Sequence, residues 1–203
     1  MANLDEIVTA AAKVFRTKGY HAATVQDIAD EVGILKGSLY HHVESKEDLL
    51  YLIVREPIAR MYQTMSDIVA ADASAVDKLR RAILAHLEAF DRHYPHLFVY
   101  LREREEMKRR FRERIKLSPK QYERFWQQIV REGMKSGEFR ADRDAQIVSY
   151  GLLGMLNWLY RWYRPQGRLT VREVAEQFTA LTLDGLTTAA SKRSVARGRG
   201  RRT

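Results

Sequence analysis

Residues 24–43 constrain the fold of this chain more than any other stretch, because they carry the signals for two short helices that cross at a steep angle. Thr24 and Asp27 have the spacing of a helix N-cap and its acidic partner at position N3. Gly33 tolerates the positive φ of a tight turn, and Ala29 is small enough to be crossed by a second helix. Apolar residues spaced to hold both helices against a core are Val25, Ile28, Val32, Ile34, Leu39 and Val43. The pattern predicts a helix-turn-helix.

The remainder of the chain also favours helices. It contains only four prolines, and strand-like alternation of β-branched residues is scarce. Periodicity and capping signals predict helices over about 4–18, 24–32, 36–43, 45–70, 76–92, 98–116, 118–136, 144–163 and 171–186. Pro57 lies inside the fourth of these and should kink it. We therefore expect an all-α fold of about nine helices, the first three forming an N-terminal helix-turn-helix domain.

The positive charge of the chain is concentrated at one end. The net charge of +9 suggests a polyanionic partner such as nucleic acid. Residues 1–50, however, hold five Lys or Arg against eight Asp or Glu, whereas residues 191–203 hold six Lys or Arg and no acid. The overall charge is thus weak support for a DNA site in the first fifty residues, and residues 191–203 are expected to be a disordered basic tail.

Several classes of protein are excluded by composition. The chain has no cysteine, which removes disulfides, thiolate metal sites and cysteine nucleophiles. Charged residues interrupt the N-terminal segment, so no signal peptide is indicated. The most apolar run, residues 147–159, is shorter than the ~20 residues that a membrane-spanning helix needs. We expect a soluble, cytoplasmic protein with no membrane partner.

The sequence contains no pattern typical of catalysis or of a bound cofactor. It has no nucleophile elbow, no phosphate loop and no metal-ligand spacing. His41 and His42 are adjacent, but neighbouring residues on a helix point ~100° apart and chelate a metal together poorly. His86, His93 and His96 are interpreted as packing or surface groups. We therefore expect no enzyme activity, no metal and no cofactor.

The segments 11–20 and 24–49 together resemble the N-terminal signature of the TetR family of transcription regulators. The similarity extends over about residues 4–55. Two positions depart from the family pattern: Leu35 stands where a Ser or Thr helix cap is common, and Val43 stands where Phe is usual. The first should weaken capping of the second helix of the motif, and the second should thin the packing beneath it.

The resemblance implies which residues face DNA. They lie on the second helix of the motif or at helix N-termini: Thr24, Lys36, Gly37, Ser38, Tyr40, His41 and Lys46. Gly37 would let the backbone approach DNA closely, and Lys36 would reach a phosphate or a guanine edge. Thr24 and Lys46 would offer phosphates the positive end of a helix dipole. For Tyr40, a packed core position is the alternative interpretation.

The resemblance also implies a C-terminal helical domain over residues 51–190 that binds a ligand and forms a homodimer. The helices over 144–163 and 171–186 are the expected dimer face, where Gly151 and Gly154 permit close approach of another helix. Residues expected to line an effector pocket are Tyr62, Met65, Phe90, Tyr94, Phe98, Trp126, Ile129, Asn157 and Trp158. For the tryptophans, core or dimer-interface positions are the alternative.

The segments 33–42 and 161–170 look like those of TetR-like regulators of fatty-acid or sterol catabolism, which often respond to acyl-coenzyme A thioesters. A basic stretch, residues 102–116, holds eight Lys or Arg against four Glu and includes Arg102, Arg104, Arg109 and Arg110. It is either a solvated helical face or a site for a phosphorylated ligand.

Together these features predict a ligand-responsive dimeric repressor. It would bind a palindromic double-stranded DNA operator and be released by a small hydrophobic effector, for which an acyl-CoA is one candidate. The alternative is an architectural or interaction protein that binds nucleic acid through the Arg-rich tail.

Overall fold

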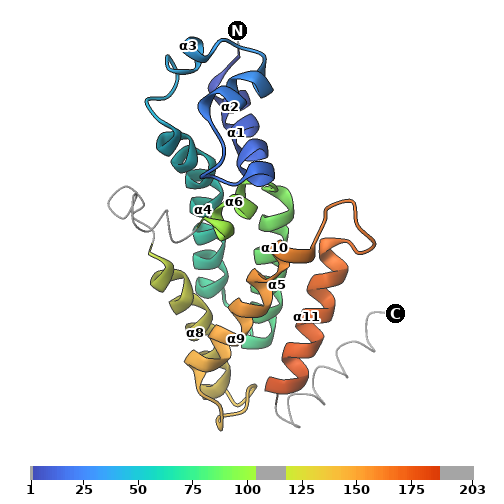
Figure 1. Ribbon diagram of the computed structural model, residues 1–203. Helices are drawn as coiled ribbons and strands as arrows, with labels where there is room; N and C mark the ends of the chain where they lie inside the picture. Colours follow the sequence, from blue (N-terminus) through green and yellow to red (C-terminus); the bar gives the residue numbers. More distant parts are fainter. Residues whose placement is uncertain (1, 104–117, 188–203) are drawn as a thin grey trace. The chain divides into compact units, whose positions relative to one another are not determined.

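The computed structural model describes residues 2–103 and 118–187 (Figure 1). These residues form α1 (Leu4–Lys18), α2 (Val25–Val32), α3 (Lys36–Leu39), α4 (Lys46–Ala70), α5 (Ala75–Arg92), α6 (His96–Arg102), α8 (Pro119–Lys135), α9 (Ala145–Asn157), α10 (Leu159–Trp162) and α11 (Val171–Leu186). The predicted all-helical class is confirmed: within these ranges, extended pairing is limited to one antiparallel bridge between Phe139 and Thr187. Nor does any helix there combine the length and apolar character needed to cross a membrane. Most of the predicted basic stretch and the whole basic tail lie outside the described residues.

Most helix starts follow local capping rules. The Thr24 hydroxyl accepts the Asp27 N–H at 3.1 Å, and the Asp27 carboxylate accepts the Thr24 N–H at 2.9 Å, which confirms the predicted cap of α2. The same reciprocal pair opens α11 through Thr170 and Glu173. Short-range signals thus determine where these helices begin.

Two helices are shorter than the sequence predicts. The second helix of the motif was expected over 36–43, but α3 ends at Leu39. Leu35 offers no side-chain acceptor at its start, and the N–H groups of His41 and His42 bond to carbonyls only three residues earlier, as in tight turns. The helix expected over 144–163 is also divided, because the backbone turns at Trp158 between α9 and α10.

The described residues form two compact units. The first contains residues 2–60 and 89–103, and the second contains residues 61–88 and 118–187. The chain passes from one unit to the other within α4 and within α5. Pro57 lies inside α4, as predicted, and is buried.

In the first unit, α1 packs against both α2 and α6. Its core is formed by fully buried apolar side chains, among them Ile7, Ala11, Phe15, Ile28, Leu39 and Leu49. Arg16 on α1 donates to the Tyr94 hydroxyl at 2.9 Å and lies over its ring. Arg102 donates to the Arg16 carbonyl at 3.2 Å. Polar contacts therefore supplement apolar packing between α1 and the segment 94–102.

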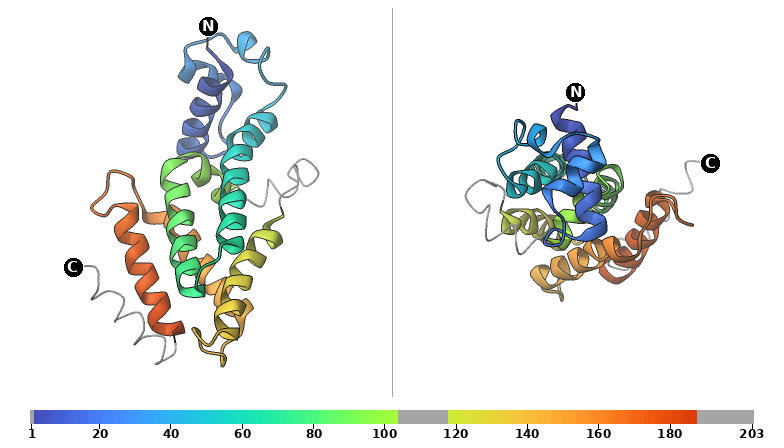
Figure 2. Two further views of the ribbon diagram at one scale, coloured as in Figure 1. Left: turned by 180° about the vertical axis from the view of Figure 1, so that it is seen from behind. Right: turned by 45° about the horizontal axis from the view of Figure 1, so that its top comes forward.

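In the second unit, α8 and α9 lie side by side, as both figures show (Figure 1, Figure 2). After α8 the chain turns back, and the Phe139 ring packs against Gly133. A Cβ atom at Gly133 would lie 2.2 Å from that ring, so only glycine fits there. Lys78 is nearly buried, and its ammonium group is paired with Glu132 at 2.8 Å and the Val69 carbonyl at 2.8 Å.

Candidate functional site

The turn between α2 and α3 has the geometry that a helix-turn-helix requires. Gly33 adopts a left-handed conformation, with φ of 77° and ψ of 34°. Its N–H and that of Ile34 both bond to the Ala29 carbonyl, at 2.9 and 3.0 Å. Ala29 is fully buried, as expected for the small residue that the second helix crosses. Gly33 thus ends α2 and redirects the chain into α3.

The segment around α3 presents a polar surface on a buried anchor. Leu39 is fully buried, whereas the side chains around it are exposed: Lys36, Ser38, Tyr40, His41 and His42. Tyr40 is 48% exposed, which disfavours its interpretation as a packed core tyrosine. At Gly37, no atom lies within 4 Å of where a Cβ would be, so the backbone is open to close approach. Residues 35–43 contain no acid.

Thr24 is exposed at the N-terminus of α2, but a carboxylate already occupies part of that site. Asp27 accepts hydrogen bonds from the Thr24 N–H and, at 2.7 Å, from Lys18. These bonds, led by the one from Lys18, lower the pKa of Asp27 to about 2. The negative charge of Asp27 therefore persists under all ordinary conditions, and it offsets the helix dipole that would attract a phosphate to Thr24.

Lys46 has internal partners. Its ammonium group donates to the carbonyls of Tyr20 and Ala23, both at 2.9 Å, and to that of His21 at 3.4 Å. It also lies 4.6 Å from the centre of the Tyr20 ring. The side chain thus ties the start of α4 to the connection between α1 and α2, a role that the sequence pattern did not indicate. A phosphate would compete with these carbonyls for the same three N–H donors.

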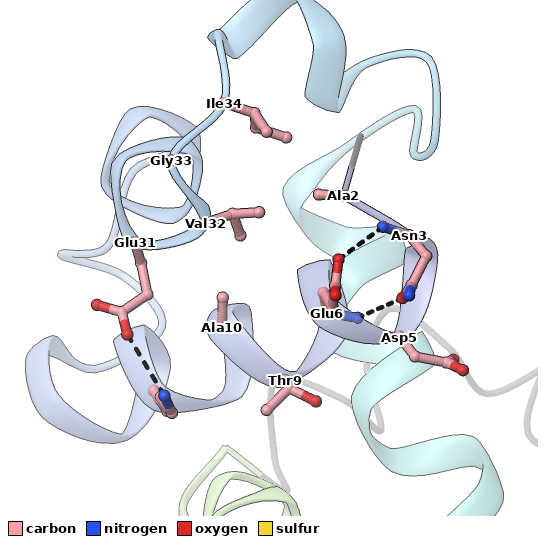
Figure 3. A pocket seen from close by; sticks show the side chains of 11 residues that line it. Ala2, Asn3, Asp5, Glu6, Thr9, Ala10, Glu31, Val32, Gly33 and Ile34 are labelled. Carbon is pink, nitrogen blue, oxygen red and sulfur yellow. Dashed lines mark hydrogen bonds and ion pairs between the residues drawn. The ribbon is translucent and has the colours of Figure 1, made fainter.

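A hollow of about 730 Å³ lies between the start of α1 and the end of α2 (Figure 3). Asp5, Glu6 and Glu31 line it together with Lys13, which pairs with Glu31 at 3.6 Å. Several acids of the N-terminal segment therefore gather around this hollow instead of on α3. None of the residues predicted to contact an effector lines it.

The second unit exposes large apolar side chains on consecutive helices. Those on α9, α10 and α11, or between them, are Ile147, Tyr150, Trp158, Trp162 and Leu181. Along α9, positions 147, 150, 151 and 154 are all exposed and, with the exposed C-cap residue Trp158, recur at helical spacing, so they share one face. At Gly151, Gly154 and Gly185 no atom lies within 4 Å of a built Cβ. This face suits close packing against another helix.

The predicted effector-contacting residues are divided between the two units. In the second unit, Tyr62, Met65, Trp126 and Ile129 are buried, Asn157 is half-buried and Trp158 is 57% exposed. In the first unit, the rings of Phe90, Tyr94 and Phe98 form a chain of edge contacts 5.9 and 6.1 Å apart. The exposure of Trp158 favours the dimer-interface interpretation over a pocket-lining one.

His86 and Tyr122 were not among the predicted site residues, yet they lie at the centre of the second unit's aromatic core. The His86 ring contacts both Tyr122 and Trp126, and its Nδ1 lies 3.0 Å from the Tyr122 hydroxyl oxygen. Burial lowers the pKa of His86 to about 4. A signal was present in the sequence, because His86 shares the apolar face of α5 with Ile83 and Phe90.

Comparison with known proteins agrees with this geometry. Residues 7–51 match the family model of bacterial regulatory proteins of the tetR family, and residues 72–186 match a tetracyclin repressor-like C-terminal domain. The HTH-type transcriptional repressor KstR2 of Mycobacterium tuberculosis is 35% identical over 184 residues, which cover 90% of this chain and 92% of that protein.

Solved structures show the same relationship. The ketosteroid transcriptional regulator KstR2 of M. tuberculosis superposes with a TM-score of 0.86 at 32% identity, covering 93% of this chain and 97% of that one. AibR, solved in complex with isovaleryl coenzyme A and operator DNA, has a TM-score of 0.75 at 26% identity, covering 86% of this chain and 95% of its own. With a matching DNA-binding motif, a matching C-terminal domain and repressors as full-length relatives, this chain belongs to the TetR family and is a helix-turn-helix transcriptional repressor.

Proposed function

We propose that the chain is one half of a homodimeric repressor whose two helix-turn-helix motifs bind the half-sites of a palindromic operator. The observation that carries this proposal is the exposed, acid-free segment 36–41 held on the buried Leu39. Such a segment offers cations, hydroxyls and open backbone to DNA without placing a carboxylate against a phosphate.

Within that segment the side chains divide the contacts. We assign Lys36 to a phosphate or a guanine edge, Tyr40 and His41 to a phosphate or a thymine methyl group, and Ser38 to a phosphate. Gly37 allows the backbone to come close. Thr24 adds an N-terminal contact that Asp27 weakens. Lys46 supports DNA binding mainly by fixing the connection between α1 and α2, because its ammonium group donates to the carbonyls of Tyr20 and Ala23.

Dimerisation follows from the exposed apolar face of α9, α10 and α11. A single helix-turn-helix buries too little surface for tight, specific binding, so two copies are needed on DNA. Scattered apolar residues are normal on a surface, but five large ones on successive helices mark an association site. A second copy of the chain supplies the same apolar chemistry in an isologous contact.

We assign residues 1–50 to DNA binding, 51–190 to effector binding and dimerisation, and 191–203 to an accessory basic tail, with the protein acting in the cytoplasm without enzyme activity. Both family-model matches end before residue 191, so they give no support to the tail as the main nucleic-acid site.

The proposed effector is an acyl-CoA thioester that binds the core of the C-terminal domain. The AibR structure contains a short acyl-CoA, and KstR2 is described as a ketosteroid regulator. Residues of the second unit proposed to contact the effector are Tyr62, Met65, Trp126, Ile129 and Asn157. To lower operator affinity tenfold, the effector must bind the DNA-free state more tightly than the DNA-bound state by ~1.4 kcal/mol.

Two linked measurements test the function. Selection of random duplex DNA with the full chain should yield a palindrome, and a chain shortened to residues 1–190 should bind it specifically. If the shortened chain loses all specific binding, the tail carries the activity and the proposal is wrong. Decanoyl-CoA is then titrated into the protein–operator complex with free coenzyme A as control. An unchanged operator affinity would exclude this effector class.

A further inference from the structure

The second unit contains a tightly packed aromatic cluster of four side chains: Tyr62 on α4, His86 on α5, and Tyr122 and Trp126 on α8. We call it the His86–Trp126 cluster. Ring centres lie 5.1 Å apart for Tyr62 and Tyr122, 5.8 Å for His86 and Tyr122, and 6.0 Å for His86 and Trp126. All four side chains are buried, and Trp126 is completely so.

Most polar atoms of the cluster have partners. The Tyr62 hydroxyl donates to the Ser118 carbonyl at 2.7 Å. The His86 imidazole pairs with the Tyr122 hydroxyl at 3.0 Å and hydrogen-bonds the side chain of Asn157. The exception is Trp126: its Nε1 is buried and has no hydrogen-bond partner among the residues that the structure describes.

A buried indole N–H without a partner is unusual and informative. The great majority of buried polar atoms in proteins are hydrogen-bonded, because leaving one unpaired forfeits its interactions with water. The indole nitrogen is a donor only, so what completes it must be an acceptor. Ligand sites in proteins typically combine an apolar lining with a few such polar groups that fix orientation.

The character of the cluster defines the acceptor. Because burial lowers the pKa of His86 to about 4, its imidazole is neutral near pH 7. None of the four side chains is then charged, and a neutral, buried environment disfavours anions strongly. A phosphate or carboxylate is therefore a poor occupant, whereas a carbonyl oxygen is a neutral acceptor of suitable size.

We propose that the His86–Trp126 cluster is the subsite that recognises a neutral carbonyl oxygen in the effector, with Trp126 Nε1–H donating to that oxygen. This inference rests on the proposed role of the second unit in effector binding. The carbonyl is either that of the thioester itself or one carried further along the acyl part. The charged portion of a CoA ester would lie elsewhere.

The test compares matched ligands on the wild-type chain and on Trp126→Phe, which keeps an aromatic ring and removes the N–H. The ligands are decanoyl-CoA, its thioether analogue S-decyl-CoA, and 9-oxodecanoyl-CoA. Two affinity ratios are measured: decanoyl-CoA against S-decyl-CoA for the thioester carbonyl, and 9-oxodecanoyl-CoA against decanoyl-CoA for a carbonyl further along the chain. On the wild-type chain, the ligand that carries the recognised carbonyl should bind at least about tenfold more tightly than the ligand that lacks it. On Trp126→Phe the affinity ratio for that pair of ligands should fall close to one. The pair whose ratio falls identifies which carbonyl is recognised.

Trp162→Phe, on an exposed residue outside the set expected to contact the effector, is the matched control and should leave both ratios unchanged. Ratios of affinities are used because Trp126→Phe could weaken all ligands equally through packing. If both ratios are the same in the wild-type chain and in Trp126→Phe, the proposal is overturned.

A second measurement uses the wild-type chain without DNA, so it does not depend on whether a variant folds. Nitrogen-15 labelling of tryptophan gives one indole N–H signal for each of the three tryptophans. Adding 2-decanone should move the Trp126 proton signal downfield and leave those of Trp158 and Trp162 in place. If 2-decanone moves this signal but no CoA ester binds, the subsite stands and the acyl-CoA proposal falls. If CoA esters bind but neither they nor 2-decanone move the signal, the subsite falls and the effector class stands.

Discussion

The helix-turn-helix and the second unit both expose large apolar side chains, but the surroundings of these side chains differ. Around α3, Leu35 and Tyr40 stand among polar residues and open backbone. On α9 to α11, five such side chains follow one another along successive helices, beside glycines with free space around them. The first surface suits a polar, charged partner, and the second suits another apolar face. The first surface is therefore the proposed DNA-reading surface, and the second is the proposed self-association surface.

The largest expected effect is on operator affinity. It comes from placing the same backbone strain in each of the two regions, by substituting a glycine that has a positive φ. Gly33 and Gly137 have φ of 77° and 76°, and neither has an atom within 4 Å of a built Cβ. Valine at either position costs about 1–3 kcal/mol of strain. Gly33→Val should reduce operator affinity by about 100-fold, roughly 2.7 kcal/mol, because the turn orients α3. Gly137→Val should change operator affinity little. Equal losses in a filter-binding assay would show that general stability controls DNA binding.

The next effect concerns self-association. Leu181 is 65% exposed and Leu35 is 79% exposed, so glutamate at either position leaves the core intact. Leu181→Glu should weaken dimer formation by about 100-fold, since an unpaired carboxylate would be buried between the two copies. Leu35→Glu should leave the dimer unchanged and weaken only DNA binding. Sedimentation equilibrium distinguishes the two, and a dimeric Leu181→Glu protein would remove this face from the interface.

The core of the second unit should carry its own pH dependence. The folded-state pKa of His86, about 4, lies below the 6.5 of an unexceptional histidine, so protons bind the unfolded chain preferentially. Above pH 6.5 His86 makes no difference to stability, and between pH 6.5 and 4 the free energy of unfolding falls with decreasing pH. The loss attributable to His86 should reach about 2 kcal/mol by pH 5.

Urea unfolding of His86→Gln measures this contribution, because glutamine can hydrogen-bond but does not titrate in this range. The variant should lose less stability between pH 6.5 and 5 than the wild-type chain. His42→Gln, on an exposed residue of the first unit, controls for the removal of a histidine. If the free energy of unfolding depends on pH equally in the wild-type chain and in His86→Gln, the lowered pKa of His86 is not the cause of the pH dependence.

The smallest expected effect is the loss of operator affinity when one phosphate contact is removed. Lys36→Ala should weaken operator binding about tenfold and reduce the salt slope of log affinity by about 1 if Lys36 meets a phosphate. A loss of discrimination between operator variants, with the slope unchanged, would assign it to a base edge instead. Lys120→Ala, on an exposed lysine of the second unit, should alter neither quantity.

The helix-turn-helix was predictable because its signals are local. Thr24, Asp27, Ala29 and Gly33 act within ten residues of one another, and each performs the structural role that its type and spacing predicted. The end of α3 was predicted less well. The missing cap at Leu35 was visible in the sequence, but its consequence for helix length was not.

The core of the second unit could not be assembled from the sequence. His86, Tyr122 and Asn157 are separated from one another by 35 or more positions, so their meeting depends on how α5, α8 and α9 pack. Lys46 shows the same difficulty at shorter range. Its position suggested a DNA contact, whereas its bonds to Tyr20 and Ala23 depend on the path of the chain between α1 and α2.

The uneven burial of the three tryptophans has an optical consequence. Trp126 is completely buried, while Trp158 and Trp162 are exposed on the proposed dimer face. Intrinsic fluorescence of a chain that keeps only Trp126 would follow events in the core, and emission from the other two would follow contact with a second copy. Because the native residues already divide in this way, effector binding and subunit association can be followed as separate signals without an added dye.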